Sequence, residues 1–338
     1  MARMRGILSK LRPQRDGPAV LRAFGKLPVS REFIHVEDGE GAARAFAEWL
    51  GAGHDTWVAA HSDASAGPAA ARGAMLTGRL VARLPRFESL WIVASIWPSH
   101  DQAPRQFPFT LYVVLPAAGL PVEPAGRWAA CVPLWERFDQ IFPELQRGDL
   151  DGVQASLREQ RINSGAGDAA ALLQECAAQA AGVPLKGWLA ALGGEAARDP
   201  LAWLWWLQRI AEEWCSDDAQ RVALAARFPL STAHPQAPQL VSWLGWLELQ
   251  CRAVARRSSL MLPVAPDAGA ALSLLENPLR PDDFQLLTSD ARRFAGVEDI
   301  AQPSGSMRRE GFEPFVQRLS RALPLETASL RDWSELKL

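Results

Sequence analysis

The spacing of apolar residues changes along this 338-residue chain, and the change limits what the chain can fold into. Before residue 133, short β-branched or aromatic runs alternate with clusters of Gly and Pro. From residue 133 onward, apolar residues recur three and four positions apart, which is the period of an amphipathic helix. The pattern predicts an α/β fold, in which a mixed sheet is covered by helices as an α/β sandwich, with an additional helical region.

Individual elements follow from the same patterns. In the first part we expect a helix over 42–50, closed by the glycines at 51 and 53, and strands over 56–61, 78–84, 91–96 and 110–115. Helices are expected over 134–147, 150–161, 168–181 and 200–215, with a loop at 163–167. A smaller α/β pattern follows, with strands over 221–229 and 259–264 and helices over 240–254 and 268–275.

These patterns divide the chain into five regions. They are a basic N-terminal tail (1–22), an N-terminal α/β region (23–132), a helical region (133–220), a C-terminal α/β region that completes the body (221–295), and a linker with an amphipathic C-terminal tail (296–338). In that tail, Phe312, Phe315, Val316, Leu319 and Leu323 fall on one helical face. Such a face is expected to cover another part of the protein.

Charge, hydropathy and cysteine usage exclude several classes of protein. A formal net charge of −2 argues against wholesale nucleic-acid binding. The longest continuous apolar run, 201–207, is far shorter than the roughly 20 residues that a bilayer requires, and no apolar stretch of about 7 to 15 residues follows the N-terminal basic residues. The cysteines at 131, 176, 215 and 251 stand singly, without C-x-x-C spacing. We therefore expect a cytoplasmic protein with reduced thiols.

Histidine and carboxylate residues provide one candidate metal site. Its ligands would be His54, Asp55, His61 and Asp63. The predicted strand over 56–61 would place His54 and His61 at opposite ends, so loop residues that cap turns are the simpler interpretation. A second pair, His100 and Asp101, is adjacent in a predicted loop, where neighbouring side chains seldom face the same ligand.

Catalytic signatures are missing from the sequence. It has no phosphate-binding glycine loop, G-x-S-x-G elbow, H-E-x-x-H helix or EF-hand loop. We expect a non-enzymatic protein without a metal or organic cofactor. The alternative is a metal-dependent hydrolase that uses the Asp and His residues of the 54–101 region.

Tryptophan is concentrated in the helical part of the chain. Seven of the fourteen tryptophans lie between positions 188 and 246, and Trp203, Trp206, Ile210 and Trp214 share one helical stripe. Leu201, Leu204 and Trp205 make the first turns of that helix apolar all round, so the helix is expected to be buried. We favour the interpretation that this helix belongs to the core of the protein. The alternative is that it forms a partner-binding surface.

Two motifs carry a family resemblance. Gly25-Lys26-Leu27-Pro28, followed by Ser30, Glu32, Phe33 and Ile34, resembles the G-K-L-P-S-x-G-D-F opening of the TagF family, also called ImpM. Pro98-Ser99, Asp101, Arg105 and Phe107-Pro108-Phe109-Thr110 resemble the family's P-S-x-D-x-x-G-R-x-F-P-L-T segment. Arg31-Glu32 replaces the family's Gly-Asp pair, so the first turn is expected to differ in shape. In the second motif, Pro104 replaces the family's Gly.

A weaker third stretch extends the resemblance toward the C-terminus. Ser258-Ser259-Leu260, followed by Pro281, Phe284 and Leu286-Leu287, is similar to the family's closing strand and P-x-x-F-x-x-L-L ending. The resemblance therefore covers the first 130 or so residues well and the rest in patches.

The resemblance implies a cytoplasmic, non-enzymatic regulator that restrains bacterial type VI secretion after translation by contacting a forkhead-associated-domain scaffold protein. The alternative is a structural or baseplate-associated component of the same machine. The partner-binding candidates are Lys26, Ser30, Glu32, Ser99, Asp101 and Arg105. For Asp101 and Arg105, four apart between prolines, two roles remain open: they brace the loop internally, or they offer charges to a partner.

Overall fold

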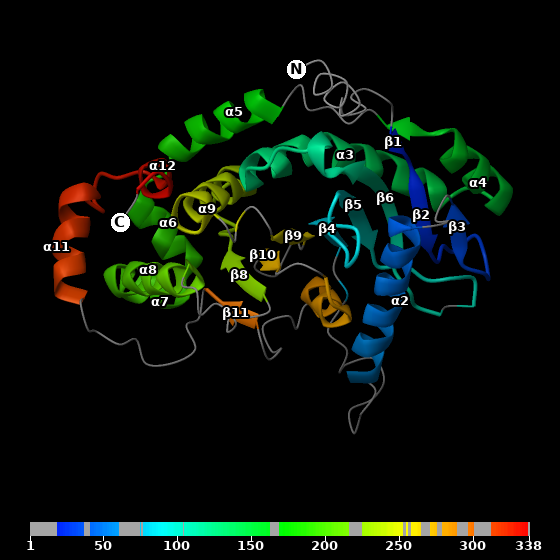
Figure 1. Cartoon of the computed structure of the whole chain (residues 1–338), viewed down its shortest axis with the longest axis horizontal. Coiled ribbons are helices and arrows are strands. Elements are labelled where there is room, and N and C mark those ends of the chain that lie inside the picture. Colours follow the sequence, from blue (N-terminus) through cyan, green and yellow to red (C-terminus); the bar gives the residue numbers. More distant parts are fainter. Residues whose placement is uncertain are drawn as a thin grey trace, which may run out of the picture.

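The computed structural model describes residues 19–36, 41–60, 75, 77–103, 105–162, 169–215, 225–252, 255, 258–264, 271–275, 279–288, 297–300 and 312–336. Its centre is a nine-stranded sheet (Figure 1). In sheet order the strands are β11 (Val297–Asp299), β8 (Ala225–Pro229), β10 (Ala271–Leu275), β9 (Ser259–Val264), β4 (Thr77–Ala82), β5 (Leu90–Trp97), β6 (Phe109–Pro116), β2 (Arg22–Gly25) and β3 (Ile34–Val36). Neighbouring strands are antiparallel except β11 and β8, which are parallel, so the sheet is mixed.

The remaining elements surround this sheet. The helices are α2 (Ala42–Ala60), α3 (Pro124–Leu145), α4 (Leu150–Glu159), α5 (Ala169–Ala181), α6 (Leu185–Leu192), α7 (Gly194–Arg198), α8 (Pro200–Cys215), α9 (Gln236–Gln250), α11 (Phe312–Ala322) and α12 (Leu330–Ser334). Two 3-10 helices, η2 (Ala117–Gly119) and η5 (Pro281–Leu287), and a separate pair of short strands, β1 (Ala19–Val20) and β7 (Arg161–Ile162), complete the described elements. The predicted α/β class is confirmed.

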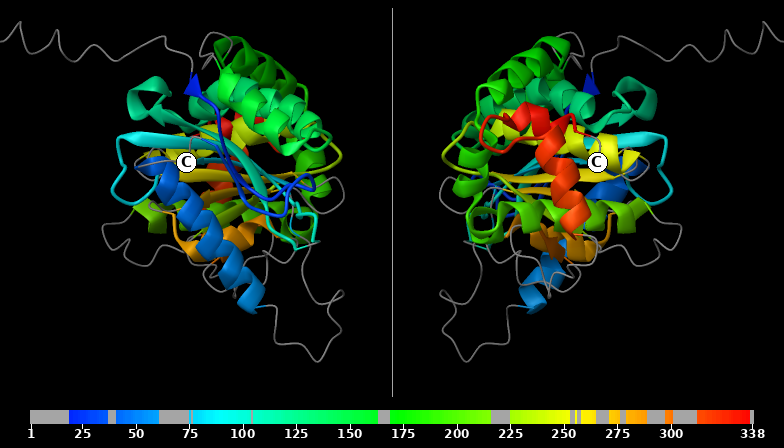
Figure 2. Two further views of the ribbon diagram at one scale, coloured as in Figure 1. Left: turned by 90° about the vertical axis from the view of Figure 1, so that its right-hand side faces the viewer. Right: turned by 90° about the vertical axis from the view of Figure 1, so that its left-hand side faces the viewer.

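Both faces of the central strands are buried. On one face Ile92, Ala94 and Ile96 of β5 join an apolar cluster with α2 and η5. On the other, Trp91 and Val93 join a larger cluster that includes α3 and the helices that follow it. Figure 2 shows these helical layers on the two sides of the sheet. Strands covered on both faces have continuous apolar sequences rather than alternating ones, as β5 and β6 do.

The tryptophan-rich helices are core. Trp188, Trp203 and Trp243 are fully buried, with ring centroids 5.6 to 6.5 Å apart. Each indole N–H has an acceptor, since Trp188 donates to Gln239 Oε1, Trp203 to the Ile300 carbonyl and Trp243 to the Pro229 carbonyl, each at 2.9 Å. The favoured core interpretation is therefore correct, because a large aromatic side chain is buried at little cost when its polar atom is satisfied.

The predicted amphipathic tail helix is also present. On α11, Phe315 and Leu319 are buried, and Phe315 lies 5.0 Å from Trp205 of α8 between ring centroids. The apolar face of the tail therefore covers α8, beside which α11 lies in Figure 1.

Two sequence predictions of secondary structure are wrong. The segment 56–60 belongs to α2 rather than to a strand, and the glycines at 51 and 53 lie inside this helix. Gly53 is needed for close packing, since a Cβ there would meet Phe284 of η5. The predicted helix over 268–275 is wrong in its described part, because 271–275 form β10, buried between β8 and β9. The expected loop at 163–167 lies outside the described residues.

Within the described part of the chain, no helix combines the length and apolar character that a bilayer crossing requires.

Candidate functional site

The two motif loops meet where β2 ends and β6 begins. Gly25, the last residue of β2, is paired with Phe109 and has φ of +129°. A Cβ at this position would collide with the carbonyl oxygen of Pro108. Glycine is therefore required here both by the backbone conformation and by the close approach of two strands. This approach brings the loop 26–33 beside the loop 98–108.

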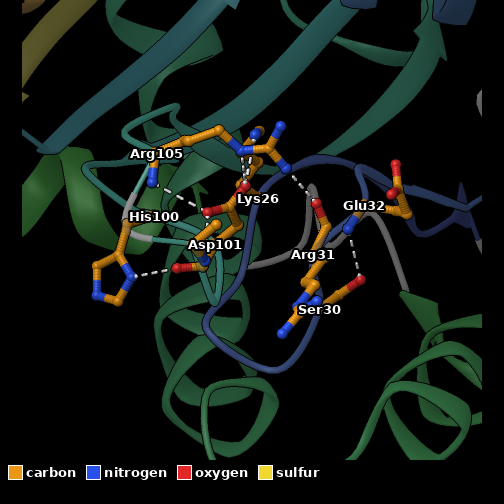
Figure 3. Close-up of polar contacts among 8 residues, drawn as sticks. Lys26, Ser30, Arg31, Glu32, His100, Asp101 and Arg105 are labelled. Atoms are coloured by element: carbon orange, nitrogen blue, oxygen red, sulfur yellow. Dashed lines mark hydrogen bonds and ion pairs between the residues drawn. The ribbon is translucent and has the colours of Figure 1, made fainter.

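The Asp101 carboxylate is the centre of the contact between these loops (Figure 3). Its Oδ1 accepts hydrogen bonds from the backbone N–H groups of Ala103 at 2.8 Å and Arg105 at 3.0 Å. Its Oδ2 accepts from Lys26 Nζ and from Arg105 Nε, both at 2.7 Å. The Asp101 side chain has no exposed surface, and these four donors satisfy its two oxygens.

The surroundings of Asp101 keep it ionised. Burial by itself raises the pKa of this carboxyl, but the hydrogen bonds from Lys26, Arg105 and Ala103 outweigh burial and hold the pKa well below its usual range. Lys26 is buried with it, since only 7% of the lysine side chain is exposed. The ammonium of Lys26 also lies 4.8 Å from the centroid of the Phe33 ring, a cation–π contact.

Further hydrogen bonds tie the two loops together. The Arg105 side chain donates from Nη2 to the Arg31 carbonyl at 2.7 Å, and the Gln102 N–H donates to the Ser30 carbonyl at 3.0 Å. Within the first loop, Ser30 Oγ accepts from the Glu32 N–H at 3.0 Å. Because the contacts join both backbones, each loop restrains the other.

The six predicted partner-binding residues divide into three groups by exposure. Lys26, Ser30 and Asp101 are buried, Ser99 is half-buried, and Glu32 and Arg105 are exposed. The hypothesis that Lys26 and Asp101 offer their charges on an exposed surface is wrong, because their charged groups face each other inside the protein. The internal brace between Asp101 and Arg105 is present. The long-range partner Lys26 was not expected from the sequence.

The exposed side chains of the two loops form a surface that we call the loop rim. Its residues are Arg31, Glu32, Phe33, Gln102 and Arg105. Phe33 is 39% exposed, and its ring packs against Phe107 at 4.8 Å and Phe24 at 5.7 Å between centroids. Sequence reasoning did not select Phe33 as a site residue. The available signal is alternation, because Ile34 must point into the core and therefore turns Phe33 outward.

The candidate metal ligands do not form a site in the described residues. His54 lies in α2, buried against the rings of Phe107, Trp57 and Phe284. Burial lowers its pKa, against a smaller opposing effect of Asp55. His54 Nδ1 is 3.9 Å from Asp55 Oδ1, which is too long for a hydrogen bond. The predicted strand that would separate His54 from His61 is absent from 56–60, and the remaining candidates, 61 and 63, lie outside the described residues.

His100 and Asp101 also face different neighbours. His100 Nδ1 lies 3.0 Å from the Asp101 backbone oxygen, whereas the Asp101 carboxylate faces Lys26 and Arg105. Among the residues that the structure describes, no three His, Cys, Asp or Glu side chains are placed to share a metal ion.

Comparison with known proteins identifies the part of the chain that holds both loops. Residues 23–156 match the family described as "TagF N-terminal domain, Type VI secretion system-associated". No curated protein matches the sequence significantly. The solved structure of PA0076 from Pseudomonas aeruginosa PAO1 is similar over 79% of this chain and 93% of its own, with 11% identity and a TM-score of 0.41, a likeness too small to support an argument. The family match confirms the resemblance to the type VI secretion-associated TagF family over residues 23–156, the part of the chain that holds both motif loops.

Proposed function

We propose that this protein is a non-enzymatic accessory protein of a bacterial type VI secretion system, and that it represses secretion after translation by binding a protein partner through the loop rim. The observation that carries the proposal is the arrangement of the two TagF motif loops. Exposed side chains lie at their edge, while the buried Lys26–Asp101 ion pair and the partly exposed Arg105–Asp101 ion pair hold the two loops together.

The composition of the loop rim suits protein recognition. Aromatic residues and arginine are enriched among the side chains that contribute most to binding energy, and the rim offers Phe33 and Arg105. Of the large apolar side chains in the described residues, Phe33 and Val122 are the exposed ones. An exposed aromatic ring and a guanidinium on the same pair of loops give a partner both apolar area and a directed hydrogen-bond donor.

The brace under the rim favours binding without rearrangement. Arg105 is held by Asp101 and by the Arg31 carbonyl, so part of its side-chain entropy is already lost before a partner arrives. Preorganised side chains pay a smaller entropic cost on association. We therefore assign Lys26, Ser30 and Asp101 to support of the surface, and Glu32, Phe33 and Arg105 to contact.

The partner in this proposal is a forkhead-associated-domain scaffold of the secretion system, met in the cytoplasm. The family resemblance supports this choice. The two rivals give different outcomes in purified material: a structural component would be present stoichiometrically in isolated baseplates, and a metal-dependent hydrolase would retain about one tightly bound metal ion per chain.

Overproduction in the native bacterium tests the proposal. Surplus protein should lower effector release while the transcripts and protein amounts of the secretion components stay constant. Surplus Arg105→Ala protein should repress effector release less than surplus wild-type protein does. Arg209→Ala is the matched control, because the Arg209 side chain is 61% exposed and that of Arg105 is 59% exposed. Unchanged effector release, or a proportional fall in component transcripts, would contradict post-translational repression.

A further inference from the structure

Two cysteines that are distant in the sequence meet in the fold. Cys215 is the last residue of α8, and Cys251 directly follows α9. The Cys215 thiol donates to the Gln250 carbonyl at 3.2 Å, and the Cys251 thiol donates to the Ala211 carbonyl at 3.6 Å. Each thiol thus bonds to the last turn of the other's helix. Because Gln250 is bonded directly to Cys251, the contact of Cys215 with the Gln250 carbonyl places the Cys215 sulfur next to the backbone of Cys251.

The two thiols differ in their access to solvent. Cys215 is exposed, whereas Cys251 is completely buried. Burial, and then the neighbouring Cys215, raise the pKa of the Cys251 thiol. A reagent from solution therefore meets Cys215 first, and Cys251 is in place to react only with a group that forms on Cys215. The other cysteines, Cys131 and Cys176, are buried on α3 and α5.

We propose that Cys215 and Cys251 are a redox modification site that takes a hydroperoxide as oxidant and forms a reversible disulfide within the chain. In the first step the Cys215 thiolate attacks the terminal oxygen of the hydroperoxide. The O–O bond breaks, the leaving alkoxide takes a proton to become an alcohol, and Cys215 becomes a sulfenic acid.

In the second step the Cys251 sulfur attacks the Cys215 sulfur. The S–S bond forms, the S–O bond breaks, and the departing hydroxide takes the Cys251 proton and leaves as water. In sum, two thiols lose two electrons and two protons, and one hydroperoxide is reduced to an alcohol and water. A thiol reductant reverses the modification.

The disulfide would join the ends of two core helices. It would link α8, which carries Trp203, to α9, which carries Trp243, at their C-terminal ends. A cross-link between distant positions restricts the unfolded chain, so the oxidised protein should melt at a higher temperature than the reduced one. Disulfides in cytosolic proteins are commonly transient and redox-sensing, which fits one exposed and one buried thiol.

The test uses the full chain and hydrogen peroxide. After oxidation, free thiols are alkylated under denaturing conditions, and the protein is digested without reductant for mass spectrometry. We expect one linked peptide pair, containing Cys215 and Cys251, that disappears after treatment with dithiothreitol. The melting temperature should rise on oxidation and return on reduction. Cys176→Ala, the control, should keep the link, and Cys215→Ser should lose it.

A trapping variant follows the first step. In Cys251→Ala, peroxide should leave a sulfenic acid on Cys215 that reacts with dimedone, and in the wild type this adduct should be much weaker. The proposal is overturned if Cys251 stays fully alkylatable in oxidised wild-type protein, whether Cys215 is overoxidised, linked to a second molecule or unreacted. Because this outcome is read from the wild type, it does not depend on the folding of any variant.

Discussion

The Nζ atom of Lys26 lies 2.7 Å from Oδ2 of Asp101, and this ion pair joins two loops that are 75 positions apart in the chain. Arg105 binds the same carboxylate oxygen from the solvent side. One acid therefore holds two cations in different environments, a buried ammonium and a half-exposed guanidinium. In the proposed function, Lys26 therefore supports the loops and Arg105 contacts the partner.

Substitution of the two cations should have unequal effects on stability. Lys26→Met leaves the Asp101 carboxylate without its buried partner, so the melting temperature should fall by several degrees. Arg105→Ala should lower it much less, because the exposed guanidinium is screened by solvent and Asp101 keeps Lys26 and its loop amides. Thermal melts of both variants check this order. An equal loss, or a larger loss for Arg105→Ala, would contradict it.

The Asp101 carboxyl should make stability depend on pH in a defined direction. Its pKa is lowered in the folded protein, so its contribution is complete above the unfolded value of about 3.9 and is lost as pH falls below that value. The wild-type advantage over Asp101→Asn should therefore stay constant from neutral pH to about pH 5 and shrink at lower pH. Urea unfolding of both proteins across this pH range measures the difference in stability. A wild-type advantage that grows on acidification would contradict the prediction.

Gly25 should tolerate no side chain. Gly25→Ala places a Cβ against the Pro108 carbonyl at positive φ, which should cost about 1–3 kcal/mol from backbone strain alone. Gly51→Ala is the control, because a Cβ at Gly51 of α2 meets nothing within 4 Å. In a helix it should stabilise the protein by up to about 1 kcal/mol. Denaturant unfolding of both variants should give opposite signs.

The tryptophan cluster should behave as core rather than as an interface. Trp188→Ala removes a fully buried indole and should cost about 3–5 kcal/mol of unfolding free energy. Trp206 on α8 is only half-buried, so Trp206→Ala should lower the unfolding free energy by less. Urea unfolding of the two variants compares these costs. A small loss for Trp188→Ala would argue against a core role.

The strands at the centre of the sheet could be predicted because short β-branched or aromatic runs, separated by clusters of Gly and Pro, mark them in the sequence. The expected strands at 78–84, 91–96 and 110–115 differ from β4, β5 and β6 by one or two residues at each end. The end of α2 was not predictable in this way, since Thr56, Trp57 and Val58 favour a strand by type. Packing of α2 against η5 decides its conformation instead. Likewise the fully buried β10 lacks the alternation that distinguishes a strand from a helix.

The candidate site was predictable only where its contacts are local. Asp101 and Arg105 lie four residues apart in one loop, so their pairing could be inferred from the sequence. The contact of Asp101 with Lys26 depends on the register of β2 beside β6, which no local pattern specifies. Lysine side chains are also rarely buried, so a sequence gives little reason to predict that Lys26 is buried. The approach of Cys215 to Cys251 depends in the same way on the packing of α8 and α9.

Binding of the loop rim to the secretion scaffold tests the central claim most directly. Calorimetric titration of the scaffold's forkhead-associated domain should show that Phe33→Ala and Arg105→Ala each weaken binding about tenfold or more, or ~1.4 kcal/mol, while both proteins melt near the wild-type temperature. The matched controls are Val122→Ala, an exposed apolar residue away from the rim, and Arg209→Ala, and both should bind as the wild type does. Equal affinity for all four variants, or a loss that only follows the unfolded fraction, would contradict recognition through the loop rim.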